Sequence, residues 1–492
     1  MECNKRPQAD CRLPDCIYVN TKRKYCRKAN NTRRVFNPEM SLKLPKTHTV
    51  VPKQVISSIQ RKVATQKISK FIKKSGRFLQ VVCEDSGQCL SFGNNVHEIV
   101  NYFNGFTDFK HVENSVLPIG DLSSNGFVRQ LKYSKNGYTA YAVLKSSADI
   151  DTDNLVYEYV VGIKFVNRVI QQFPCFVYTY GLFFYKSFRD YLTMRDEVDT
   201  ISGSNFLPKS LVLQKEIDYK KACSQSRYAS ILIQNLNKVD SFGDALSDNT
   251  GNFIKYQLTN VLFIIYHALS TLSKVFTHYD LHRGNVLIFR PYKETTIQYV
   301  YHMTGSKTIM FKCPFIPKLI DYGRCFFDNG NVTSKSVYQK ICSIPECGKC
   351  GQDYGFTNLS PTEFYGISVQ KKNESHDLRL VYELDKLVKF INIGMRESDY
   401  RKAYSYKKLE KVIQKVKYGE TLSTSKKSYG TPEDTTLHPK GNVVANVTDM
   451  FNELKKIVTH PDVMSENLDY EIPISGTFHV YEDGRPMEFI KE

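Results

Sequence analysis

The segment THYDLHRGNVLIF, residues 277–289, carries the strongest signal in this sequence. It holds His278, Asp280 and Asn285 in a defined spacing, after a run of helical periodicity and directly before a strand-like run. Asp321 follows downstream in an Asp-Tyr-Gly tripeptide, after a second short strand-like run. A carboxylate can accept the proton of a substrate hydroxyl, and the oxygens of an amide and a second carboxylate are ligands for Mg²⁺. The ordered set therefore points to one site for proton transfer and metal binding; the alternative is a surface loop that fits by chance.

Together these residues resemble the catalytic loop of protein kinases, H-R-D-x-x-x-x-N, followed by the metal-binding D-F-G. The resemblance implies an α+β, bilobal protein kinase-like fold, with a β-rich N-lobe, a helical C-lobe, and ATP and Mg²⁺ between them. It implies that Asp280 orients the substrate hydroxyl, while Asn285 and Asp321 hold the metal. The insertions and the basic N-terminal segment are similar to those of divergent serine/threonine protein kinases of large DNA viruses, especially iridovirus-like ones.

A protein kinase also needs a lysine on its third strand and a helical carboxylate to hold it. The run AVLK ends at Lys145 and fits the family's V-A-I-K strand, which implies that Lys145 contacts the α- and β-phosphates. Glu158, in a predicted helix over 153–172, is the favoured partner. Asp151 and Asp153 are nearer alternatives, although acidic residues are common at helix starts for capping reasons. The other interpretation of Lys145 is a solvated strand residue.

The glycine-rich loop of the family, G-x-G-x-x-G-x-V, is degraded here. Gly120 and the pair Gly126 and Val128 can form its two ends, but the middle glycine is missing and there is one extra residue. Phosphate binding needs backbone N–H groups brought close, which glycine permits most freely. An ordinary β-turn explains the glycines nearly as well. The resemblance places the adenine against the backbone near Gln234 to Leu236, between the lobes.

Several positions depart from the family pattern. Tyr279 replaces the Arg that pairs with a phosphorylated activation loop, so we expect no phosphate-gated activation. His282 stands in place of a Lys, and D-L-H-x-G-N is reminiscent of aminoglycoside and choline kinase-like phosphotransferases. His282 is interpreted either as a donor to the γ-phosphate when protonated or as a packing histidine. No A-P-E tripeptide follows Asp321. Asp377 resembles the buried aspartate that opens the central C-lobe helix, and a helix N-cap explains it equally well.

The remaining sequence supports two lobes, in the order of a β-rich half and then a helical half. We expect a β-hairpin from 127–133 and 138–145 around an Asn-Gly turn, and strands at 175–185 and 228–236. Helical periodicity predicts helices at 53–74, 153–172, 253–276, 377–391, 402–417 and 444–458. The expected domains are a basic, flexible extension at 1–77 and an N-lobe at 78–236, with a polar, irregular insertion at about 186–228. A C-lobe at 237–460, with an inserted hairpin at about 290–316, and a tail at 461–492 follow.

The charge of this 492-residue chain is concentrated at one end. Of its 68 Lys and Arg residues, 20 lie in residues 1–77 with only 4 of the 50 Asp and Glu residues, leaving 48 against 46 elsewhere. The basic arm could contact nucleic acid, an anionic membrane or an acidic protein surface, or it could be a solubilising tail. The near-neutral remainder contains the kinase-like residues. We therefore expect the basic arm to determine where the protein is located in the cell and not which reaction it catalyses.

The other global features concern cysteines and location. Cys342, Cys347 and Cys350 include a Cys-x-x-Cys knuckle of the zinc type, with Cys325 as the candidate fourth ligand, but only half of a Zn²⁺ site is clear. The alternatives are a dithiol and plain reduced cysteines. A weaker cysteine series lies in the basic arm. The charged N-terminal sequence and the lack of a long apolar run predict no secretion and no transmembrane segment, hence an intracellular protein of the host cytoplasm or virion. The expected activity is protein serine/threonine phosphorylation; a small-molecule phosphotransferase and a pseudokinase or virion scaffold are the alternatives.

Overall fold

The structure is a computed structural model, and the residues that it describes are 16–20, 24–28, 89–123, 126–147, 154–197, 201–219, 228–236, 239–247, 251–292, 294–305, 308–341, 356–357, 364–365, 367, 369–384, 403–416, 443–468 and 472–491. The chain divides into two units, Met1–Gln54 and Val55–Glu492. In the first unit, an antiparallel hairpin joins β1 (Cys16–Asn20) to β2 (Lys24–Lys28). The predicted helix at 53–74 lies outside the described residues.

A six-stranded antiparallel sheet forms the β-rich half of the second unit, with the order β3-β4-β5-β8-β6-β7. Its strands are β3 (Val112–Ser123), β4 (Gly126–Lys135), β5 (Tyr138–Ser147), β6 (Thr179–Tyr185), β7 (Leu211–Leu213) and β8 (Ala229–Asn235). Buried and half-buried residues alternate along β4, as expected for a strand with one face in a core. Asn136 and Gly137 have φ values of 51° and 83°, so both positions of the predicted β4–β5 hairpin turn are left-handed.

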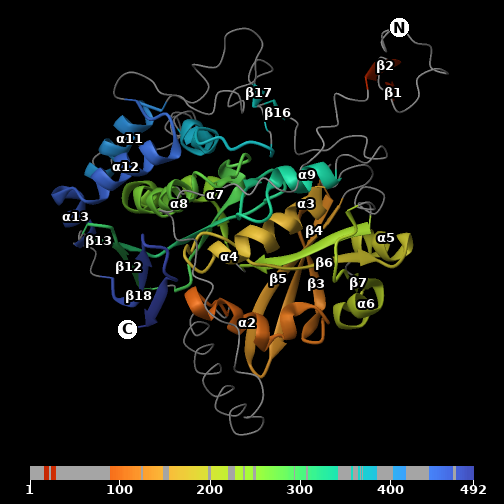
Figure 1. The fold of residues 1–492 in the computed structure, drawn as a ribbon. Coiled ribbons are helices and arrows are strands. Elements are labelled where there is room, and N and C mark those ends of the chain that lie inside the picture. Colours follow the sequence, from red (N-terminus) through yellow and green to blue (C-terminus); the bar gives the residue numbers. More distant parts are fainter. Residues whose placement is uncertain are drawn as a thin grey trace, which may run out of the picture. The chain divides into compact units, whose positions relative to one another are not determined.

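Helices cover both faces of this sheet (Figure 1). On one face, α3 (Asn154–Val161) continues through a π-helical turn, Gly162–Val166, into α4 (Asn167–Val169), which confirms the helix predicted at 153–172. On the other face lie α2 (Val96–Tyr102) and the short 3-10 turns Gly93–Asn95 and Asn104–Phe106. Strand β5 contributes Ala142 and Leu144 to the core on one face and Val143 to the core on the other, which fixes the strand and positions the side chains that leave it.

The segment expected to be an irregular insertion, about 186–228, is instead largely ordered. It forms α5 (Phe188–Asp196), α6 (Gly203–Ser210) and β7, which pairs with β6 at the sheet edge. Tyr191, Met194 and Leu207 are buried against the sheet. A short apolar stripe spaced three residues apart within a polar sequence gives little periodic signal, which is why the helices were missed.

The helical half is built around α8 (Leu258–Leu272), which is preceded by a π-helical turn at Phe253–Gln257 and is buried along nearly its whole length. Packed on it are α11 (Tyr404–Ile413) and α12 (Val447–Val458), both predicted. α13 (Pro461–Leu468) packs against α11 and α12, and α7 (Phe242–Leu246) packs against the π-helical turn and β11. The described remainder comprises short strands and α9: β9 (Asp240–Ser241), β10 (Phe276–Thr277), β11 (Val286–Phe289), β14 (Ile316–Leu319), β15 (Phe326–Phe327), α9 (Ser334–Ile341), β16 (Phe356–Thr357) and β17 (Phe364–Tyr365).

The hairpin expected between 290 and 316 is present as β12 (Thr296–His302) and β13 (Thr308–Cys313). The segment 461–492, set apart above as a tail, contains α13 and two strands, β18 (Ile474–Tyr481) and β19 (Glu488–Lys491). β18 pairs in parallel with β12, giving a four-stranded sheet of order β13-β12-β18-β19. Phe478 and Val480 are fully buried in the main core. The segment 474–491 is therefore part of the helical half.

Among the described helices, none is long and apolar enough to cross a bilayer, as the sequence predicted.

Candidate active site

The loop between β10 and β11 carries His278, Asp280 and Asn285. Asp377 accepts hydrogen bonds from the backbone of this loop. Oδ2 of Asp377 accepts the N–H of His278 at 2.7 Å and Oδ1 accepts the N–H of Tyr279 at 2.9 Å. Tyr279 has a φ of 63°, a left-handed conformation that is unfavourable for a residue with a side chain. The two hydrogen bonds stabilise that conformation. Burial raises the pKa of Asp377 to about 7, although the two N–H donors oppose the rise.

Tyr279, which stands where the family carries Arg, is fully buried. Its hydroxyl donates to the carbonyl of Lys371 at 2.7 Å, and its ring lies 4.8 Å from that of His376. A buried neutral ring supplies no charge to a phosphorylated segment. The position therefore contributes packing to this loop.

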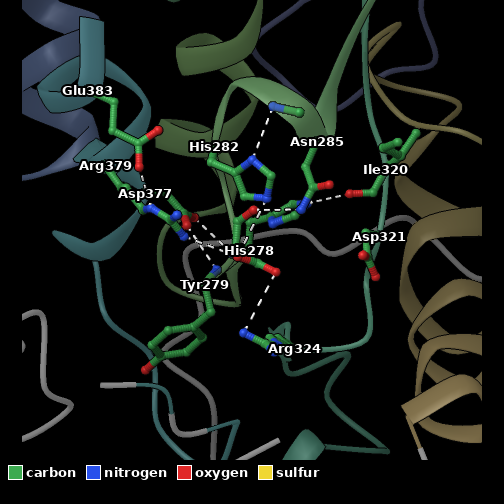
Figure 2. A network of polar contacts seen from close by, with 12 residues as sticks. His278, Tyr279, His282, Asn285, Ile320, Asp321, Arg324, Asp377, Arg379 and Glu383 are labelled. Atoms are coloured by element: carbon green, nitrogen blue, oxygen red, sulfur yellow. Dashed lines mark hydrogen bonds and ion pairs between the residues drawn. The ribbon is translucent and has the colours of Figure 1, made fainter. Parts of the chain in front are cut away.

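Two hydrogen bonds tie the loop to the strand that leads into Asp321. Nε2 of His278 donates to the carbonyl of Ile320 at 3.0 Å, and the N–H of Ile320 donates to the carbonyl of Asn285 at 3.1 Å. Burial lowers the pKa of His278 to about 4, so its ring is neutral near pH 7. Nδ2 of Asn285 donates to the carbonyl of Asp280 at 2.9 Å, which turns the amide oxygen of Asn285 to the other side (Figure 2).

Lys145 joins the two halves of the site. Its Nζ lies 2.8 Å from Oε2 of Glu158 on α3 and 2.9 Å from Oδ1 of Asp321. These partners are 13 and 176 residues away along the chain, so the structure brings together all three residues that the sequence analysis selected. Asp151 and Asp153, the alternative partners, lie outside the described residues. Asp321 itself has a φ of 67°, a second strained position in the site.

Lys145 and Asp321 stabilise each other's charge, whereas at Glu158 burial outweighs the effect of Lys145. Burial alone would lower the pKa of Lys145, but Asp321 and Glu158 outweigh it and raise that pKa. Burial alone would raise the pKa of Asp321, yet the Lys145 ammonium outweighs it and lowers the pKa. Burial also raises the pKa of Glu158, and Lys145 offsets part of that rise. Lys145 is therefore a firmly charged cation that is held in place by two carboxylates.

Asp280 faces two arginines from other elements (Figure 2). Nη1 of Arg379 donates to Oδ1 of Asp280 at 3.1 Å, and Nη1 of Arg324 lies 3.8 Å from Oδ2. His282 lies further off, with Nε2 3.9 Å from Oδ1, while its Nδ1 accepts the N–H of Gly284 at 3.0 Å. Burial lowers the pKa of His282, and Asp280 opposes that shift. The described contacts of His282 are thus those of a loop-stabilising histidine, and its role toward phosphate stays a prediction.

The residues predicted to contact nucleotide lie along the sheet. Val128 pairs directly with Lys145 in the β4–β5 register, which puts both side chains on the same face. Gly120 and Gly126, with φ values of 65° and 134°, lie on either side of the β3–β4 turn and use backbone conformations that glycine favours.

At the other end of the sheet, Gln234 lies on β8 and exchanges hydrogen bonds with Tyr178. The N–H of Gln234 donates to the carbonyl of Tyr178 at 2.7 Å, and its Oε1 accepts the N–H of Tyr178 at 3.3 Å. Leu236 follows the strand and is buried. Contact of this connection with adenine stays a prediction.

Sequence reasoning missed both arginines around Asp280. Arg324 directly follows the Asp-Tyr-Gly tripeptide, and Arg379 lies two residues after Asp377. Each arginine thus lies close in sequence to an aspartate that the motifs had selected. A basic residue beside such an aspartate is the sequence signal by which both could have been predicted.

The proposed zinc ligands Cys342, Cys347 and Cys350 lie outside the described residues. Cys325 is buried, and its Sγ donates to the carbonyl of His278 at 3.4 Å. In the part of the chain that the structure describes, no group of three or more His, Cys, Asp or Glu side chains is arranged to hold a metal ion.

The similarity of this chain to known proteins is one of structure. No family model matches the chain, and no curated protein matches it. Among solved structures, a Plasmodium kinase domain is similar over 50% of this chain and 67% of its own length, with 17% identity and a TM-score of 0.26. The kinase-like α+β fold is inferred from the structure of this chain itself, namely from its strand order and from the contacts of Lys145, Glu158 and Asp321.

Proposed function

We propose that this chain is an ATP-dependent protein kinase that transfers a phosphoryl group to Ser or Thr hydroxyls of proteins, and that it is of viral type. The observation that carries the proposal is the position of Lys145. A half-buried lysine held by a helix carboxylate and by the aspartate of an Asp-Tyr-Gly tripeptide is the arrangement that phosphoryl transfer in this class requires.

The donor set fits Mg²⁺. Asp321 offers an anionic oxygen from a side chain that is 39% exposed, and Asn285 offers a neutral oxygen because its nitrogen is used by the carbonyl of Asp280. Hard oxygen donors of this kind, one carboxylate among them, are what Mg²⁺ binds in phosphate sites. Asp321 and Asn285 would hold the ion, which would supply neutralisation of the phosphate oxygens.

The chain's own residues perform three tasks in this proposal. Lys145 pairs its charge with the α- and β-phosphates, and Glu158 keeps that ammonium at the sheet face. Asp280 accepts a hydrogen bond from the acceptor hydroxyl and aligns its oxygen with the γ-phosphate. The attacking oxygen forms the new bond to phosphorus while the bond to the bridging oxygen of ADP breaks, and the hydroxyl proton passes to Asp280.

Nucleotide binding is tested separately from turnover. MgATP should raise the melting temperature of the wild-type protein, and Lys145→Met should abolish that rise. Lys132→Met is the matched control, because Lys132 on the neighbouring strand β4 is an exposed residue paired with Glu113 at 2.9 Å. An equal rise in wild type and Lys145→Met would refute the nucleotide site.

Turnover is tested with labelled ATP. Wild-type protein should label itself or protein acceptors on Ser or Thr, and Asp280→Ala should lower the rate about 10²–10⁴-fold while the protein still folds. Asp321→Asn should also lose activity, through the metal site. Acceptor panels that include aminoglycosides and choline distinguish the small-molecule alternative. Binding of MgATP without any transfer would instead favour the pseudokinase or scaffold.

A further inference from the structure

Asp280 is held by a side chain from outside its own loop. Nη1 of Arg379 donates to Oδ1 of Asp280 at 3.1 Å, and Nε of the same guanidinium donates to Oε1 of Glu383 at 2.7 Å. The side chain of Arg379 is only 9% exposed, and those of its two partners are 16% and 19% exposed. In Figure 2, Arg379 and Glu383 lie together at the edge of the loop.

This geometry leaves Arg379 little freedom. A guanidinium is a rigid planar fork, so two carboxylates on different edges determine its orientation. Because it also lies in a largely buried position, the pair with Asp280 is less screened by solvent than a surface pair would be. One oxygen of Asp280, Oδ1, is therefore fixed. Oδ2 lies 3.8 Å from Nη1 of Arg324, beyond hydrogen-bond distance.

The element that carries Arg379 also holds the loop's backbone. The helix begins with the 3-10 turn His376–Leu378, continues with Arg379 and is described as far as Leu384. Asp377 on its first turn accepts the N–H groups of the two residues before Asp280, so a single stretch of helix fixes both the backbone and the carboxylate. Tyr279, being buried and neutral, cannot supply the orienting charge from within the loop.

We propose that Arg379 is a positioning residue that sets the side-chain orientation of Asp280 for phosphoryl transfer, and that Glu383 braces it. The inference rests on the proposed function. Its competitor is a purely structural role, in which Arg379 and Glu383 are an ordinary ion pair spaced four residues apart on a helix and the contact with Asp280 is incidental.

Steady-state kinetics of Arg379→Gln give the first test. Without the guanidinium, Asp280 can rotate away from the acceptor, so we expect kcat to fall about 10²-fold while the KM for ATP stays unchanged. Arg379→Lys keeps the charge but not the fork, and should recover part of the loss. Arg195→Gln is the matched control: Arg195 pairs with Asp196 through two contacts of 2.7 and 2.8 Å in the β-rich half, so its loss should leave kcat at the wild-type value.

A double-mutant cycle with Asp280→Asn separates positioning from structure. If Arg379 acts through Asp280, then Arg379→Gln changes kcat by less than about 2-fold in an Asp280→Asn background. A structural role predicts the same fold-loss in both backgrounds, and that result would overturn the inference. Where Arg379→Gln does not fold, Arg379→Lys is used in the cycle. A wild-type protein without turnover overturns the proposed function together with this inference, whereas an active wild type matched by Arg379→Gln overturns the inference alone.

Discussion

Replacement of Asp377 by Ala gives the sharpest check on how the loop that carries Asp280 is built. The carboxylate accepts the N–H groups of His278 and Tyr279, and both lie in the buried interior of the site. Each orphaned buried donor costs about 1–3 kcal/mol, so Asp377→Ala should lower the free energy of unfolding by about 2–6 kcal/mol. Asp377→Asn retains one acceptor oxygen and should cost about half as much, about 1–3 kcal/mol.

The same substitution should reduce turnover by more than its effect on stability explains. Tyr279 is in a left-handed conformation, which costs about 1–2 kcal/mol in a residue other than glycine. Once the hydrogen bonds from Asp377 are lost, the loop relaxes and moves Asp280 with it. A displacement of about 1 Å is enough for a loss of about 10²-fold in kcat.

Urea denaturation measures the stability, and phosphoryl transfer at a temperature where every variant is folded measures the turnover. Asp449→Ala is the control, since Asp449 on α12 accepts the N–H of Ala445 at 3.1 Å and none of its described hydrogen bonds is made with the loop at 277–289. It should lose stability without losing kcat. An Asp377→Ala protein with a wild-type unfolding midpoint, or with the turnover of Asp449→Ala, would refute the reasoning.

Three further predictions concern other parts of the molecule. Burial lowers the pKa of His267 from 6.5 to about 4, so protonation favours the unfolded chain: the stability is complete above pH 6.5 and is lost as the pH falls toward 4, by about 3 kcal/mol. His267→Phe should flatten that part of the curve of unfolding free energy against pH, and an unchanged curve would contradict the assignment. Because Tyr279 carries no charge to a phosphorylated segment, phosphatase treatment should leave labelled-ATP transfer intact, and a large drop would show that loop phosphate is needed after all. Phe478→Ala on β18 should lower the unfolding free energy by about 3–5 kcal/mol in urea, and a loss below about 1 kcal/mol would mean that the strand adds little to the core.

The site was predictable from sequence to the extent that its signals are local. Asp280, Asn285 and Asp321 lie at a recognisable spacing between short strands, and Lys145 and Glu158 are only 13 residues apart. The structure shows the expected pairing of Lys145 with Glu158 and adds a contact between Lys145 and Asp321. The chemistry at each position needs a particular residue type, so the pattern remains visible in a divergent chain.

The remaining features depend on contacts that no local pattern encodes. Arg379 reaches Asp280 from 99 residues away, and although its place two residues after Asp377 draws attention to it, that place does not name Asp280 as its partner. The pairing of β18 with β12 could not be predicted for a similar reason, because the two strands of a parallel pair can lie at any separation along the chain. The helices of 186–228 were missed because their buried positions are few and their surroundings polar.

The pairing of β18 with β12 has a consequence for how the protein is made. Thr296 is synthesised 178 residues before its partner Ile474, so the β12–β13 hairpin leaves the ribosome without the neighbour that completes its sheet. Until then, one edge of β12 presents unpaired backbone groups, and the site of Phe478 in the core is unfilled. At about 5–20 residues per second, this interval lasts on the order of 10 s or more. We expect the nascent chain to need chaperone protection during that interval, and the helical half to close only when its late strand arrives.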